Sequence, residues 1–188
     1  MTTMRRASAA PDKLLEAALE LIVEVGWDAV TTRLLADRAG VGPGLVHYHF
    51  SSVPALLRGA AFGAIDQALT EAIDRMASCA DVSAGLDVLA DRIDRPPPDR
   101  LAVLFVEALC AAHRDPALRS ALLTRLGAFR ADLEGWLAGR GAPQPRRTAA
   151  VLATTIDGML VRRAVFGGRA RSGERAQLHR VLGDRDCA

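Results

Sequence analysis

Aromatic side chains are scarce in this sequence: they make up 4% of its 188 residues, although 50% of the residues are hydrophobic. Alanine and leucine supply most of the apolar residues, and both favour helices over strands. An excess of charge of one sign is also lacking, since 24 Lys and Arg stand against 22 Asp and Glu and give a formal net charge of +2. Global charge therefore argues neither for nor against a nucleic-acid partner.

Cysteines are few and widely spaced. Cys79, Cys110 and Cys187 are odd in number, and no two of them form a CxxC pair. This pattern offers neither a disulfide framework nor a zinc site, and it fits a reducing cytoplasm. We therefore expect no metal, no cofactor and a cytoplasmic location.

Long hydrophobic runs are missing as well. Met1–Ala10 lacks the apolar core of a signal peptide. The most apolar early run, Leu14–Val25, is interrupted by Glu16, Glu20 and Glu24. Because a spanning helix needs about 20 predominantly apolar residues in succession, the sequence predicts no association with a membrane.

The constellations that enzymes need are not visible either. The serines carry no nucleophile motif, and the four histidines are scattered. His47 and His49 lie two residues apart, so on a helix they point to different faces and do not form a metal pair. Gly40, Gly42 and Gly44 follow no strand and precede no Lys-Ser/Thr pair, unlike a phosphate-binding loop. We expect no enzymatic activity, and a small helical enzyme is an alternative without a supporting motif.

Apolar residues recur at helical spacing along most of the chain, which predicts an all-α fold of about nine helices. Two of these are short and lie within Thr31–Phe50. The other expected helices are Pro11–Val25, Pro54–Ser78, Asp81–Asp94, Asp99–His113, Pro116–Ala138, Thr148–Phe166 and Glu174–Leu182. No internal repeat interrupts this pattern.

The stretch Thr31–Phe50 predicts a helix-turn-helix, in which a tight turn joins the two short helices. Thr31 suits the N-cap of the first helix, and small Ala36 permits the second helix to approach closely. Gly40 fits the left-handed position of the turn, and Pro43 fits the first position of the second helix. These local residue choices all favour the same motif.

This part of the chain resembles the DNA-binding segment of the tetracycline-repressor (TetR) family of bacterial transcriptional regulators. The matching elements are Gly26-Trp27, Thr31-Thr32-Arg33, Ala36, Ala39-Gly40-Val41, His47-Tyr48-His49-Phe50 and Leu56-Leu57. They cover roughly the first third of the chain, and the remainder is similar in its helical pattern and length. Residues 1–10 are expected to form a disordered arm. The resemblance implies a DNA-binding head at 11–52 and a ligand-binding and dimerisation body at 53–188, joined to the head by the long helix.

By this resemblance, the second short helix enters the major groove of a double-stranded DNA operator. The residues at the matching positions are Thr32, Arg33, Pro43, Gly44, Leu45, His47, Tyr48 and His49. Two positions depart from the family pattern, because Leu45 stands where Thr is common and Val53 stands where Lys is usual. Both departures alter expected DNA contacts, so the operator sequence does not follow from the resemblance.

Two helices of the body, Pro116–Ala138 and Thr148–Phe166, carry apolar faces too broad for one partner helix each. Two such helices from each of two chains would form a four-helix bundle, so we expect a homodimer. The interface residues expected from these faces are Leu122, Leu126, Val151, Leu152, Ile156 and Met159.

The resemblance also implies a small-molecule effector that releases a repressor from a near-palindromic operator. We expect an apolar effector inside the body, with Glu107 or His113 at its polar end. The expected lining residues are Ile73, Met76, Leu104, Phe105, Glu107, Ala108, Leu109, His113 and Phe129. An all-helical interaction module without DNA binding or an effector stays open as an alternative, and a direct DNA-binding measurement separates the two.

Overall fold

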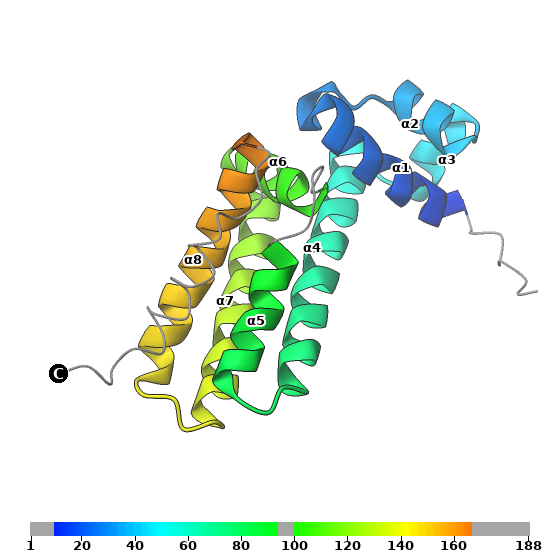
Figure 1. Cartoon of the computed structure of the whole chain (residues 1–188). Helices are drawn as coiled ribbons and strands as arrows, with labels where there is room; N and C mark the ends of the chain where they lie inside the picture. Colours follow the sequence, from blue (N-terminus) through cyan, green and yellow to red (C-terminus); the bar gives the residue numbers. More distant parts are fainter. Residues whose placement is uncertain (1–9, 94–99, 167–188) are drawn as a thin grey trace, which may run out of the picture.

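The computed structural model describes residues 10–93 and 100–166, and within these ranges the chain is all-α (Figure 1). The elements in chain order are α1 (Ala10–Val25), a 3-10 turn η1 (Trp27–Ala29), α2 (Thr32–Ala39), α3 (Pro43–His49), α4 (Val53–Ala77), α5 (Val82–Ile93), α6 (Arg100–Arg114), α7 (Pro116–Ala138) and α8 (Pro145–Phe166). The predicted fold class is confirmed, with eight α-helices in the described residues against about nine expected. The expected helix Glu174–Leu182 lies outside those residues, as does the expected arm apart from Ala10, where α1 already begins.

The helices divide into a head (α1 to α3) and a body (α4 to α8). The head lies at one end of the molecule, and α4 runs from it along the body beside α5 and α7 (Figure 1). The shorter α6 lies at the end of the body nearest the head and contacts both α1 and η1. None of the described helices combines the length and the apolarity that crossing a membrane requires.

Side chains cap the starts of the two longest helices. Ser52 Oγ accepts from the N–H of the residue three positions on, at 3.2 Å, and begins α4. Asp115 Oδ1 accepts from the N–H groups of Ala117 and Leu118, both at 3.0 Å, and begins α7. Arg58 of α4 donates to Asp115 Oδ2 at 2.7 Å. This bond, together with the one from Leu118, holds the pKa of Asp115 below its ordinary value, so the ionised cap is favoured.

Within the described residues, buried apolar side chains form two clusters. The first, here called the junction core, joins the head to α4, α6 and α7; its buried members include Leu14, Ile22, Leu35, Val46, Leu56, Phe105 and Leu118. The second, here called the distal core, joins α4, α5, α7 and α8; its buried members include Met76, Leu89, Leu133, Trp136, Leu137 and Leu152. Leu69 of α4 and Leu160 of α8 pack against both cores. The head therefore shares its core with the body.

Side chains of α7 and of the turn that follows it cap the far end of α4. Trp136 Nε1 donates to the carbonyl of Met76 at 2.8 Å. Arg140 Nη2 donates to the carbonyls of Ala77 and Cys79 at 3.2 and 2.8 Å, and its guanidinium lies over the Trp136 ring, 4.6 Å from the centroid. These bonds satisfy carbonyl groups that a helix end leaves without a helical partner, and they fix α4 against α7.

Gly85 of α5 lies directly against the Trp136 ring. A Cβ atom on Gly85 would lie 2.2 Å from Trp136 Cζ2, so the Gly85→Ala change forces the ring or the backbone to move. We expect Gly85→Ala to lower the free energy of unfolding by about 1–3 kcal/mol, the usual effect of overpacking a core. Urea denaturation followed by circular dichroism measures this change.

Gly63→Ala in α4 is the matched control, because a Cβ atom there meets nothing within 4 Å. The same substitution at this exposed helical position should raise the free energy of unfolding by about 0.5–1 kcal/mol, since alanine favours the helix over glycine. Equal effects at the two positions would contradict the close packing of Gly85 on Trp136.

Candidate nucleic-acid interface

The predicted turn between α2 and α3 is confirmed by its geometry. Thr31 Oγ1 accepts from the N–H of Leu34 at 3.3 Å and begins α2. Gly40 follows α2 with φ 65° and ψ 39°, the left-handed conformation that glycine adopts at little cost. The N–H of Val41 then donates to the carbonyl of Ala36 at 3.0 Å, which closes the turn. Short-range contacts thus set the direction of α3.

The seven-residue helix α3 is fixed by one buried side chain and exposes most of the others. Val46 is 0% exposed and belongs to the junction core. The exposed residues are Pro43, Gly44, Leu45, His47 and Tyr48. Tyr48 is 80% exposed, and its ring meets the half-buried ring of His49 edge-on, with 4.9 Å between the centroids. The outer surface of α3 can therefore contact a partner without disturbing the core.

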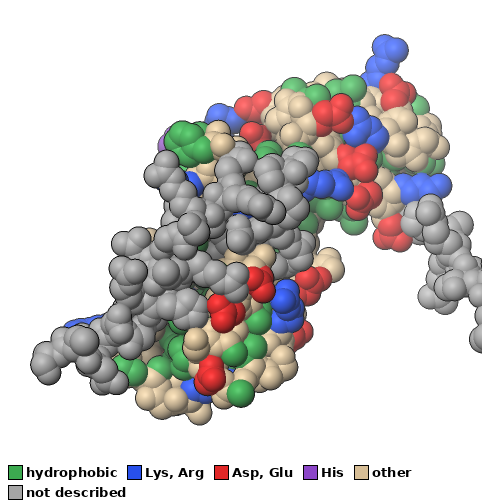
Figure 2. Space-filling model, in the orientation of Figure 1, with side chains coloured by type: hydrophobic (Ala, Val, Ile, Leu, Met, Phe, Trp, Pro, Cys, Tyr) green, Lys and Arg blue, Asp and Glu red, His purple; other side chains and the backbone are tan. Residues whose placement is uncertain are grey.

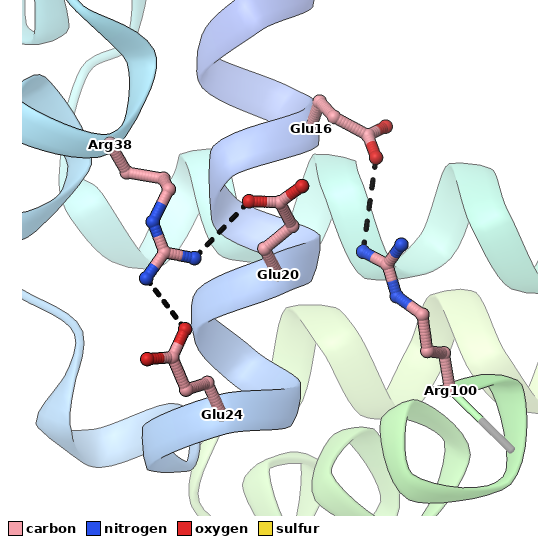
Figure 3. A network of polar contacts seen from close by, with 5 residues as sticks. All are labelled: Glu16, Glu20, Glu24, Arg38 and Arg100. Atoms are coloured by element: carbon pink, nitrogen blue, oxygen red, sulfur yellow. Dashed lines mark hydrogen bonds and ion pairs between the residues drawn. The ribbon is translucent and has the colours of Figure 1, made fainter. Parts of the chain in front are cut away.

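The two arginines of α2 have different surroundings. The Arg33 side chain is 91% exposed, and its Nε lies 3.8 Å from Asp37 Oδ2, so this loose pair can exchange for a phosphate. The Arg38 guanidinium is held by Glu24 and Glu20 of α1 at 2.6 and 3.1 Å (Figure 3). The bond to Glu24 and then that to Glu20 raise the pKa of Arg38. Of these two cations, Arg33 is the one free to meet a DNA backbone.

The head carries charged side chains of both signs, and in residues 10–49 Asp and Glu outnumber Lys and Arg. On the face shown in Figure 2, acidic and basic side chains are interspersed, and no broad patch of one sign covers α1 to α3. Long-range attraction of a polyanion is weak for such a surface. Binding to nucleic acid must therefore depend on the fit of α3 and on a few placed contacts.

The two positions that depart from the family pattern have clear places in the structure. Leu45 is 38% exposed on α3, where it presents apolar surface to a partner. Val53 is the first residue of α4 and packs half-buried against the junction core. Thr32, at the start of α2, is also half-buried. Val53 thus strengthens the attachment of α4 to the head and offers no charge to a phosphate.

The residues expected to line an effector pocket are distributed over three places. Those in or against the distal core are Ile73, Met76 and Phe129. Those in the junction core are Leu104, Phe105 and Ala108. Leu109 and His113 are exposed on α6, and Glu107 Oε2 accepts from the backbone N–H of Trp27 at 2.8 Å. The nine residues are therefore divided between two cores and the surface, and Glu107 has a partner in the head.

The residues expected at a dimer interface are mostly covered within one chain. Leu122, Leu152 and Ile156 are buried, and Leu126 and Met159 are half-buried against the cores. Val151 is 48% exposed and is accessible to a second chain. A neighbouring set of apolar residues on α7 and α8 is more exposed, with Leu123 at 67% and Val165 at 62%.

Sequence reasoning missed the polar contacts that join α6 to the head. Arg100 contacts α1, and Glu107 and Arg114 both contact η1. Their spacing of seven residues is a signal that they share one side of a helix. Their partners could not be found from the sequence, because Trp27 and Glu107 are separated by 80 positions.

Two protein-family models match the chain, one over the head and one over the body. Residues 14–60 match the family described as "Bacterial regulatory proteins, tetR family". Residues 77–184 match the family described as "Tetracyclin repressor-like, C-terminal domain". The first match covers the helix-turn-helix, and the second covers most of the body.

Individual transcriptional regulators are also similar to this chain in sequence or in structure. The HTH-type transcriptional regulator BetI of Rhizobium meliloti (strain 1021) is 30% identical over 157 residues, which are 81% of this chain and 76% of that protein. The tetracycline repressor protein class A from transposon 1721 of Escherichia coli is 38% identical over 65 residues, so the match spans 35% of this chain and 30% of that relative. A candidate transcriptional regulator from Streptomyces coelicolor A3(2) has a similar structure, with a TM-score of 0.74, 27% identity, and coverage of 93% of this chain and 98% of that one.

Arg33 of α2 and Tyr48 of α3 are both largely exposed, so both side chains are available to contact a DNA backbone. We expect Arg33→Ala and Tyr48→Ala each to weaken binding to all DNA sequences alike. Loss of the Arg33 charge should also reduce the slope of log affinity against log salt by about 1. Fluorescence anisotropy with labelled duplexes at several salt concentrations measures both quantities.

Leu45→Thr is the contrasting variant, because it restores the residue common in the family at an exposed position of α3. It should alter sequence preference more than overall affinity, since base contacts specify and backbone contacts position. Unchanged affinity in both Arg33→Ala and Tyr48→Ala would remove these residues from the interface.

Proposed function

Because the chain belongs to the TetR family of bacterial transcriptional regulators, we propose that it is a ligand-responsive repressor that binds a near-palindromic operator as a homodimer. The observation that carries this proposal is the outer surface of α3, which combines a buried anchor, Val46, with the exposed Leu45, His47 and Tyr48. In a two-fold dimer, two such helices would enter successive major grooves roughly 34–36 Å apart.

A gel shift with the promoter region of the protein's own gene tests the DNA-binding part of the proposal. A complex that forms with wild type and is weakened in Arg33→Ala would support the assignment. Selection from a random duplex library provides a second route that does not presuppose the operator. If neither experiment yields a protein–DNA complex, the repressor hypothesis is rejected and the alternative, an all-helical interaction module without DNA binding, is favoured.

We place the dimer contact on the exposed sides of α7 and α8, which pack against each other. On α8 the exposed residues at helical spacing are Val151, Thr154, Gly158, Val161 and Val165. On α7 they are Ser120, Leu123, Gly127, Ala131, Gly135 and Ala138. Both sets consist of apolar, small or hydroxyl side chains. Such surfaces allow the close approach of two helix pairs in a four-helix bundle.

Leu123→Glu tests this contact, because the side chain is 67% exposed and a single chain should tolerate the change. We expect the variant to sediment as a monomer and to lose operator binding, since a desolvated carboxylate opposes association. Analytical ultracentrifugation at micromolar concentration measures the first effect, and anisotropy measures the second.

Gly63→Glu is the control, because it adds the same charge at an exposed position of α4 where a side chain meets open space. It should remain a dimer. Dimeric Leu123→Glu would show that α7 does not carry the contact.

We place the effector where the two cores meet, around Leu69 and Leu160. Asp157 lies three residues before Leu160, on the same side of α8. Burial raises the pKa of Asp157, so the ionised carboxyl is unfavourable in its surroundings. A ligand group that donates a hydrogen bond or carries a positive charge would stabilise the ionised carboxylate of Asp157. The effector we propose is therefore an apolar molecule with a cationic or donor group, and Asp157 takes the role first expected of Glu107 or His113.

Asp157→Asn separates stability from ligand response. Because the folded-state pKa of Asp157 is raised, its ionised form destabilises the fold at neutral pH, and this effect is lost as the pH falls towards the unfolded value of 3.8. We expect Asp157→Asn to raise the Tm at pH 7 and to have less effect near pH 4. The thermal shift and operator release caused by apolar amines should be lost in the same variant.

Asp132→Asn on the exposed surface of α7 is the control and should leave both the Tm and the response to amines unchanged. If Asp157→Asn keeps the full thermal shift and operator release caused by amines, the effector does not bind at Asp157.

A further inference from the structure

One side of α6 holds the head through three polar side chains that are spaced seven residues apart. Arg100, Glu107 and Arg114 occupy the start, middle and end of the helix. Figure 3 shows the first contact, in which α1 lies between Arg38 of α2 and Arg100 of α6. We call the three residues the polar edge of α6.

The middle contact is directional and partly buried. Glu107 Oε2 accepts from the backbone N–H of Trp27 at 2.8 Å, immediately after α1 ends. Gly26 lies against the same carboxylate with φ 83°, and a Cβ atom on it would lie 3.6 Å from Glu107 Oε2. The turn from α1 to η1 therefore presents its backbone to the Glu107 carboxylate.

The two outer contacts are ion pairs at the surface. Arg100 Nη2 lies 3.8 Å from Glu16 Oε1 of α1, and Arg114 forms a close ion pair with Asp28 of η1. All four side chains are more than half exposed. Because water and salt weaken exposed pairs, these contacts guide the head less firmly than Glu107 does.

We propose that Glu107 is a positioning residue for DNA binding: through the Trp27 N–H it fixes the angle of each head on the body and thereby sets the distance between the two reading helices. This inference rests on the proposed function, in which two heads bind one operator. The apolar contacts of the junction core hold the head in place but allow it to turn, because hydrophobic burial is not directional. A hydrogen bond is directional, so it selects one of the permitted angles.

The head has two connections to the body, and their roles differ. The first is the chain itself, which continues from α3 into α4. The second is the polar edge of α6, which contacts Glu16 of α1 and the residues Trp27 and Asp28 of η1. With both connections in place the head has one orientation. Without Glu107 it keeps the first connection and the apolar contact, and it can rotate about them.

The experiment compares operators that differ in the separation of their half-sites. Selection from a random duplex library with the full-length wild-type dimer first defines the two half-sites. Duplexes are then made with the separation changed by one and two base pairs in each direction, and affinities are measured by anisotropy. We expect wild type to prefer one separation and Glu107→Leu to reduce that preference by at least about fivefold, the lower end of typical coupling between sites.

Two further variants distinguish positioning from simple loss of stability. Glu107→Gln keeps an acceptor oxygen for the Trp27 N–H and should retain the wild-type preference. Arg140→Met removes two hydrogen bonds at the far end of α4 and should lower the Tm while leaving the preference unchanged. If Glu107→Leu keeps the wild-type preference, or if every variant loses preference in proportion to its Tm, the proposal is overturned.

Hydrogen exchange provides a readout that needs no DNA. In Glu107→Leu, the amide of Trp27 should exchange faster than in wild type, whereas amides around Gly85 should not change. Unchanged protection at Trp27 would show that the link does not hold the turn and would overturn the proposal. If wild type selects no DNA while exchange at Trp27 responds as expected, the proposed function fails and the positioning role for DNA fails with it, although the link itself stands.

Discussion

The head is too small to enclose a core of its own, and this constraint shapes the rest of the structure. Its three helices occupy residues 10–49, close to the size below which single domains rarely bury enough apolar surface to fold alone. Leu14, Leu35 and Val46 are buried because α4, α6 and α7 supply the missing side of the junction core. The head and the body are therefore joined by one hydrophobic cluster. Any shift of α4 or α6 changes the surface on which the head rests.

The charged side chains of the head also serve its internal structure. Arg38 links α2 to α1 through Glu20 and Glu24, and these bonds remove a cation from those available to phosphates. Because Asp and Glu outnumber Lys and Arg in the head, its charge gives DNA little long-range attraction, so one head alone should bind DNA weakly. In the proposed dimer, two heads at a fixed separation would overcome this weakness, because the second contact becomes intramolecular once the first has formed. Precision of spacing thus compensates for a modest electrostatic contribution.

Local features of this fold could be predicted from the sequence, whereas long-range ones could not. The Thr31 cap and the left-handed Gly40 depend on neighbours within a few residues, and both were found. The helical period also identified α7 with its observed bounds and most of α8, which begins at Pro145 and not at the expected Thr148. It did not identify which residues of their broad apolar faces point outward, since Leu122 is buried and the adjacent Leu123 is exposed. Glu107 was expected, with His113 as the alternative, at the polar end of an apolar effector. In the structure its carboxylate accepts from a backbone N–H, and such a partner carries no mark in the sequence.

The strength of the polar edge suits a switch. A hundredfold change in operator affinity requires about 2.7 kcal/mol of coupling. Exposed ion pairs such as Arg100–Glu16 typically contribute about 0.2–1 kcal/mol each, and a hydrogen bond to a charged group contributes about 1.5–3 kcal/mol. The summed free energy of the polar-edge contacts is thus comparable to the coupling free energy that one bound effector would supply. The free energy from apolar burial in the junction core is far larger. Under the proposed function, an effector that moves α6 would therefore release the orientation of the head without detaching it. By reciprocity, an operator that holds the two heads at their preferred separation would favour the effector-free position of α6.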